Sequence, residues 1–158
     1  MDILVHALTG LILMKVLGFF SWYGIVFSVI PDFISYLPYF IHRFFIKRDF
    51  RYKGMKEYPT LGSFFDRLYK INHSLVFITL LFGVLYLLKI PLASYFWFWI
   101  LHILLDIPTH GTEEDGGIKF LWPLSQFKIK SKHWSEKPFW LIIHLITWSL
   151  LFIVYFIF

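Results

Sequence analysis

The sequence predicts an all-α integral membrane protein, a bundle of about five hydrophobic segments in one domain that covers residues 1–158. Hydrophobic residues make up 58% of the chain and charged residues only 16%, whereas soluble globular domains average about 25% charged residues. A core of this size cannot bury so much apolar side chain, so lipid must cover the excess. The chain contains no cysteine, which excludes disulfides and thiolate metal ligands.

Five apolar stretches carry this prediction. A spanning helix needs about 20 residues, with about 17 as the lower end, so the fourth stretch is slightly short. Short turns join the first stretch to the second and the third to the fourth, and each pair should form an antiparallel hairpin. Pro31 should bend or end the second stretch because proline removes a backbone hydrogen bond. In chain order the stretches are Ile3–Phe20, Trp22–Ile41, Ser74–Ile90, Leu92–Ile107 and Phe139–Phe158.

Two long loops, His42–Asn72 and Pro108–Pro138, hold 13 of the 15 lysines and arginines. Only Lys15 and Lys89 lie elsewhere. By the positive-inside rule, both loops and the N-terminus are expected in the cytoplasm, with the chain integral to the cell (inner) membrane. The first loop contains "RFFIKRDFRYK", which suits anionic lipid head groups better than nucleic acid when it lies beside a membrane.

Ionisable side chains gather at the cytoplasmic ends of these segments. Each would cost at least about 2.5 kcal/mol at a helix centre, and their convergence implies a shared partner. A metal ion neutralises carboxylates and binds neutral imidazoles. In the spacing HxxxDxxxH each ligand follows the previous one by four positions, which places helical neighbours on one face and indicates a zinc-like site of nitrogen and oxygen ligands. The predicted ligands are His6, Asp32, His73, His102, Asp106 and His110.

Each of these residues also has a simpler explanation. A single His6 or His73 could cap or snorkel at the interface, and Asp32 could hydrogen-bond Tyr36. His144 lies at a similar depth in the fifth segment, where it could be an extra ligand, a supporting hydrogen-bond donor or neither. The histidines of the basic loops, His42 and His133, are expected to be solvated.

Five short motifs, in this order, resemble one family. They are "VHALTG", "PDF", "NHS", "HILLDIPTHG" and "LWPLS", and they cover nearly the whole chain up to Ser125. The chain resembles the membrane-bound metal-dependent hydrolases of bacteria and archaea, a family similar to zinc-dependent phospholipase C and the fungal zinc nucleases. The resemblance implies an all-α fold, phosphoester substrates and the six ligands named above. Family members often carry a second acid after "PD", where this chain has Phe33–Ser35, and a further histidine where it has Leu68. The site could therefore bind either one metal ion or two.

The function expected from these features is metal-dependent hydrolysis in the membrane. A divalent metal, most simply zinc, is expected to bind His102, Asp106 and either His6 or His73, and to activate water against a phosphoester or lipid-like substrate. Asp32 would bridge two ions, or act as general base beside one. Asp32 and Asp106 are therefore the predicted catalytic residues.

Two basic residues, Arg43 and Lys70, are predicted to hold the substrate phosphate. The alternative function is a metal-binding membrane protein without hydrolysis, either a carrier or a structural, partner-binding protein. A carrier needs polar groups across the whole membrane thickness, whereas these gather at one face. The sequence does not predict the oligomeric state.

Overall fold

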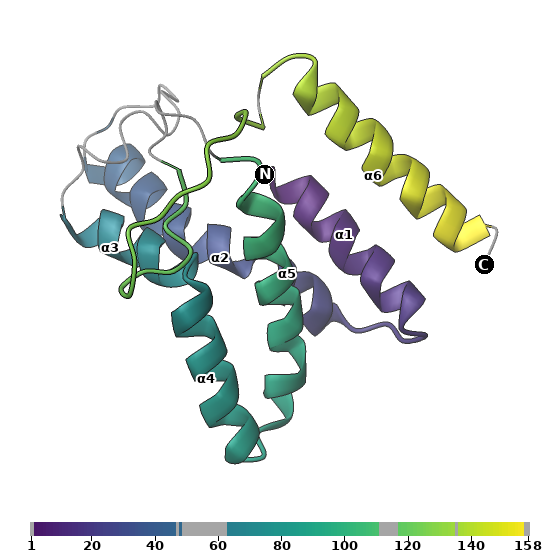
Figure 1. The fold of residues 1–158 in the computed structure, drawn as a ribbon, viewed down its shortest axis with the longest axis horizontal. Helices are drawn as coiled ribbons and strands as arrows, with labels where there is room; N and C mark the ends of the chain where they lie inside the picture. The colour runs from purple at the N-terminus through teal and green to yellow at the C-terminus, as the bar shows by residue number, and fades with distance from the viewer. Residues whose placement is uncertain (1, 47, 49–62, 111–116, 135, 157–158) are drawn as a thin grey trace.

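The computed structural model describes residues 2–46, 48, 63–110, 117–134 and 136–156 (Figure 1). These residues are mostly helical and include no β-strand, which confirms the predicted all-α class. The elements are α1 (Ile3–Val16), α2 (Trp22–Ile41), a π-helical turn η1 (His42–Ile46), α3 (Ser63–Asn72), α4 (Leu75–Leu87), a 3-10 turn η3 (Pro91–Tyr95), α5 (Phe96–Asp106) and α6 (Phe139–Phe156).

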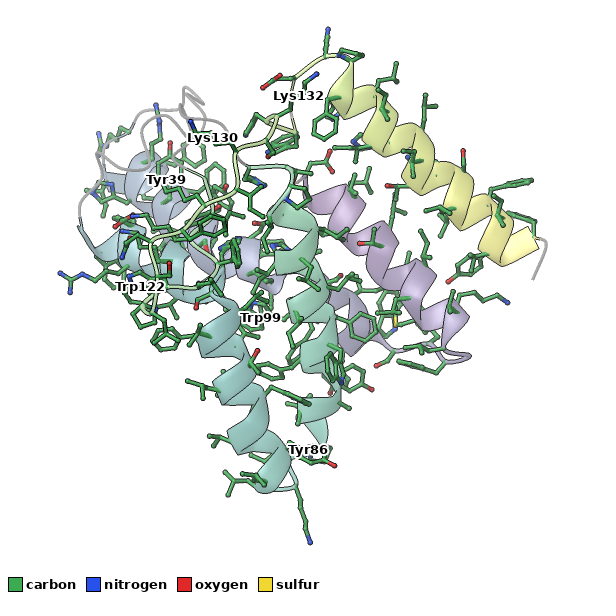
Figure 2. All side chains as sticks on the ribbon, viewed as in Figure 1. Tyr39, Tyr86, Trp99, Trp122, Lys130 and Lys132 are labelled. Atoms are coloured by element: carbon green, nitrogen blue, oxygen red, sulfur yellow. The ribbon has the colours of Figure 1, made fainter. Side chains whose placement is uncertain are left out.

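Helix α2 lies at the centre of the bundle and packs against α1, α3 and α5. Helices α4 and α5 form the predicted hairpin, and α6 lies along α1 at the outer edge (Figure 1). The apolar core forms where α4, α5 and α2 meet, and Trp99 lies between α4 and α5 (Figure 2). Its buried members are Ile78, Phe96, Trp99 and Ile103.

Fewer helices can span a membrane than the five predicted segments. Two are long and apolar enough, Trp22–Ile46 and Phe139–Phe156, and the bent pair α3–α4 could make a third. Helix α1 and the helical stretch Pro91–Asp106 are apolar but shorter. Gly18, with a φ of +74°, terminates α1 after 14 residues, and 14 residues rise only about 21 Å. That is less than the ~30 Å hydrocarbon core of a bilayer.

The second apolar segment is longer than expected, and the first long loop is partly helical. Pro31 lies inside α2 and does not end it, and η1 extends the helix to Ile46. Helix α3, Ser63–Asn72, lies within the predicted loop. Its sequence mixes polar and apolar residues and so contains no long hydrophobic stretch. Much of "RFFIKRDFRYK" falls outside the described residues.

Polar side chains cap three of the helices. The Asp2 carboxylate accepts a hydrogen bond from the Val5 amide at the start of α1, and the Ser21 hydroxyl accepts one at the start of α2. Ser74 does the same for Phe77 of α4. Each cap satisfies an amide that has no partner inside its own helix, which is costly to leave bare in a membrane.

Small residues allow α1 and α2 to approach closely. A Cβ at Gly10 would lie 2.8 Å from Oγ of Ser28, and one at Gly24 would lie 2.4 Å from Sδ of the fully buried Met14. Glycines at a helix crossing bring backbones together in this way in membrane proteins. This contact places α1, and His6 within it, against the centre of the bundle.

We expect Gly24→Ala to destabilise the fold by about 1–3 kcal/mol, because the new methyl group overpacks the contact with Met14 and Phe98. The matched control is Gly83→Ala in α4, where nothing lies within 4 Å of the new Cβ; this variant should be neutral or up to about 1 kcal/mol more stable. Thermal unfolding in detergent measures both. Equal stability of the two variants would contradict the close α1–α2 contact.

Candidate metal centre

Four ionisable side chains from three parts of the chain meet inside the bundle. Asp32 comes from α2, His73 from the break between α3 and α4, and His102 and Asp106 from α5. One ligand atom of each lies within 4.8 Å of the others, and this group could hold a metal ion. His73, His102 and Asp106 are at most 1% exposed, and Asp32 is 8% exposed.

The two imidazoles alternate with the two carboxylates. Nε2 of His73 lies 3.5 Å from Oδ1 of Asp32 and 3.6 Å from Oδ2 of Asp106. Nε2 of His102 lies 3.6 Å and 3.1 Å from the same two oxygens. All four distances exceed the 2.7–2.9 Å of a direct charge-assisted hydrogen bond. The atoms therefore surround a common point more than they pair with one another.

Backbone carbonyls orient both imidazoles with Nε2 toward this point. Nδ1 of His102 lies 2.7 Å from the carbonyl of Ser28, and Nδ1 of His73 lies 3.1 Å from that of Tyr69. A carbonyl only accepts, so Nδ1 carries the proton and donates. Within the described residues, neither Nε2 makes a hydrogen bond. Metal-ligating histidines show this pattern, in which the second nitrogen donates to a fixed acceptor.

His6 and His110 approach Asp106 from its other side. Nε2 of His6 lies 3.0 Å from Oδ1 of Asp106, and Nδ1 of His110 lies 3.3 Å from the same oxygen. The rings of His6 and His102 stack with centroids 3.7 Å apart, so protonation of both would bring two positive charges together. Asp106 thus directs one oxygen to His73 and His102, and the other to His6 and His110.

The tripeptide Asn72-His73-Ser74 has a structural role at each position. Asn72 donates to Oγ of Ser35 in α2, and its carbonyl accepts from the indole of Trp99 in α5. Ser74 caps α4 and donates to the carbonyl of Trp122. These contacts hold the 62° bend between α3 and α4, and the bend directs His73 into the group.

The stretch His102–His110 combines a helical turn with a tight reversal. His102 and Asp106 are one turn apart on α5 and share a face. After Asp106, the amides of Thr109 and His110 both donate to the Asp106 carbonyl, and Pro108, which has no amide hydrogen, cannot continue the α-helical hydrogen-bond pattern. The reversal brings His110, a predicted ligand, to the Asp106 carboxylate.

The predicted substrate-binding residues, Arg43 and Lys70, each contact a side chain one turn earlier in the chain. Arg43 is 3% exposed and donates to the Tyr39 hydroxyl at 2.7 Å. Lys70 forms an ion pair with Asp66 one turn earlier in α3. Neither residue is among the four that converge.

Two further histidines, His144 and His133, make contacts outside the group of four. His144 is not in the group of four; its Nε2 lies 2.6 Å from a carboxylate oxygen of Asp2 and joins α6 to the start of α1. His133, expected to be solvated, is half-buried and lies opposite His110 in an isolated β-bridge, with ring centroids 5.7 Å apart. No local pattern in "SKHWS" indicates that contact, because it depends on the path of residues 117–134.

The spacing and charge of the group suit a divalent ion. A tetrahedral zinc with bonds of about 2.0–2.1 Å separates its ligand atoms by about 3.3–3.4 Å, and the four imidazole–carboxylate distances run from 3.1 to 3.6 Å. Two ionised carboxylates and neutral imidazoles carry a charge of −2, which one divalent cation neutralises. Without such a partner, two buried carboxylates would repel each other in a region of low dielectric constant.

No family model, curated protein or solved structure matches the chain. The membership suggested by the sequence motifs therefore stays a prediction, and the interpretation of the site depends on its geometry.

We expect zinc at a hundredfold excess over its dissociation constant to stabilise the protein by roughly 2.7 kcal/mol. Asp106→Asn should lose most of this gain, because an amide is a poor ligand and supplies no negative charge. The control, Glu136→Gln, changes an exposed carboxylate outside the group and should respond as the parent does. Thermal unfolding in detergent, with zinc and with chelator, measures the effect; an undiminished response in Asp106→Asn would contradict the metal site.

Proposed function

We propose that the protein is a membrane-embedded, metal-dependent hydrolase that acts on a phosphoester or lipid-like substrate. The observation that carries the proposal is the convergence of four buried ligand atoms, from Asp32, His73, His102 and Asp106, within 4.8 Å of one another. The motif resemblance to membrane-bound metal-dependent hydrolases supports the same assignment.

Either one or two ions fit this proposal. The group of four holds the first ion. The second oxygen of Asp106, with His6 and His110 at 3.0 and 3.3 Å, would supply ligands for a second ion. With one ion, His6 and His110 instead hold Asp106 in position.

A zinc ion bound here supplies Lewis-acid activation of water and of a phosphoryl oxygen. Asp32 is the most exposed of the four side chains, at 8%, so water and substrate reach the group most directly at its carboxylate. With one ion, Asp32 accepts the proton of the attacking water as general base. The buried imidazoles of His73 and His102, with Nδ1 held by backbone carbonyls, keep their orientation throughout.

A cluster of lysines beside α3 favours an anionic substrate. The pKa of Lys119 is lowered, mainly by partial burial of its ammonium group and next by the positive charges of Lys70 and Lys128. These three lysines therefore lie close together, and Asp66 compensates only one of their charges. Lys70 precedes His73 by three residues on the same helical turn, where a phosphate group could contact it.

We expect the purified protein to hydrolyse members of a panel of phosphodiesters and phospholipids, to lose this activity with chelator and to regain it with zinc. Asp32→Asn should lower kcat by about 10²-fold or more, as loss of a general base does, and Glu136→Gln should leave it unchanged. Bound metal without hydrolysis of any substrate in the panel would favour the metal-binding alternative.

We also propose the predicted orientation, with the N-terminus and both long loops in the cytoplasm. The chain has no cysteine, so single substitutions report unambiguously. Gln126→Cys lies in the second loop, and Leu88→Cys lies at the α4–α5 turn; both positions are exposed. A membrane-impermeant maleimide added to intact cells should label Leu88→Cys and spare Gln126→Cys, and the reverse pattern would overturn the orientation.

A further inference from the structure

Helices α1 and α6 form a parallel pair with contacts at both ends. Near their starts, His144 of α6 lies 2.6 Å from the Asp2 carboxylate. Near their ends, Nζ of Lys15 lies 5.7 Å from the ring centre of Tyr155. Helix α6 packs chiefly against α1 at the edge of the bundle (Figure 1), and most of its apolar surface stays exposed.

An apolar groove of about 750 Å³ lies along the second half of this pair. Its volume is within the range of about 300–1,000 Å³ that ligand sites occupy. Trp148 and Tyr155 are seven residues apart, so the groove extends about 10 Å from the helix ends toward the middle. Its lining residues are Leu11, Trp148, Leu151, Phe152, Tyr155 and Phe156.

A single positive charge lies beside the outer end of the groove. Lys15 is the only lysine or arginine in α1, α2 and α6, and neither α1 nor α6 contains an aspartate or glutamate. The lysine follows His6 by nine residues, about 13.5 Å along the helix, so it lies at the opposite end of α1 from the metal centre. The site thus combines a cation at the helix end with an apolar channel that leads inward.

We propose that this groove binds one phospholipid, with its phosphate at Lys15 and an acyl chain along Trp148, at the end of α1 that is remote from the candidate metal centre. A phospholipid has a charged head group and an apolar tail. The site has the same order, with Lys15 at the end of the helices and the apolar lining toward their middle. A second copy of the chain fits less well, because a two-fold contact through this face would bring the two Lys15 side chains together. The proposal does not depend on the hydrolase function.

The test uses Trp148 as the reporter, in the full chain in detergent. Phosphatidylglycerol with brominated acyl chains quenches tryptophan on contact, and the difference between the parent and Trp148→Phe isolates the contribution of Trp148. We expect this quenching to saturate at a low mole fraction of lipid. Inorganic phosphate alone should not displace the lipid, because the groove supplies most of the binding surface, and chelator should have no effect.

Two substitutions and one control make the test specific. Lys15→Gln should weaken the apparent affinity roughly fivefold, as expected for one partly exposed charge contact, and Leu11→Phe should reduce the saturable component by narrowing the groove. Lys89→Gln removes the other lysine outside the long loops and should match the parent, with circular dichroism verifying the fold of each variant. Quenching that rises linearly and equally in all variants, displacement by inorganic phosphate, or a dimer by light scattering in which Trp148 is protected, would each overturn the proposal.

Discussion

The structure depends on the burial of two carboxylates, Asp32 and Asp106, among helices that are otherwise apolar. Asp106 is fully buried, and one imidazole or another lies within 3.6 Å of each of its oxygens. A buried negative charge is tolerated only when opposite charge and hydrogen-bond donors surround it. Helices α1, α2 and α5 and the α3–α4 break each contribute a side chain to that surrounding, so this requirement determines where the helices meet.

The break between α3 and α4 and the turn after α5 also help to surround the two carboxylates with imidazoles. At the end of α3 the Tyr69 carbonyl accepts from Nδ1 of His73 as well as from the His73 amide, and the Ser28 carbonyl of α2 orients His102. Helix α5 ends at Asp106, where its last turn reverses so that His110 returns to the carboxylate.

Sequence reasoning predicted those features that follow from local spacing. Four-residue spacing places His102 and Asp106 on one helix face, and the concentration of ionisable residues at one level of the apolar segments indicates that Asp32, His73 and His6 meet them. Local spacing says nothing about contacts made by irregular segments. It therefore missed the pairing of His133 with His110 and of His144 with Asp2, the latter across 142 positions.

The number of membrane spans and the amphipathic helix α3 were mispredicted for a related reason. Apolar composition extends through Phe20 and over Pro91–Tyr95, but a glycine with positive φ and a 3-10 turn end the regular helices there. Composition measures how apolar a segment is, whereas hydrogen-bond geometry decides how far it continues as one helix. Helix α3 is the opposite case: its composition is not apolar, yet it forms a regular helix. It is stable because one of its sides packs on α2.

Helix α1 contributes side chains both to the candidate metal centre and to the apolar groove, but from different faces. His6, Gly10 and Met14 recur every four residues and form the stripe that faces α2 and α5. Leu11 and Lys15 form a neighbouring stripe that faces α6. The first stripe packs closely against Gly24 and Ser28 of α2, and this packing fixes the position of His6. The groove depends on the second stripe. Because the two stripes contact different helices, a substitution on one face of α1 perturbs its own site first, and the two proposals can be tested separately in one protein.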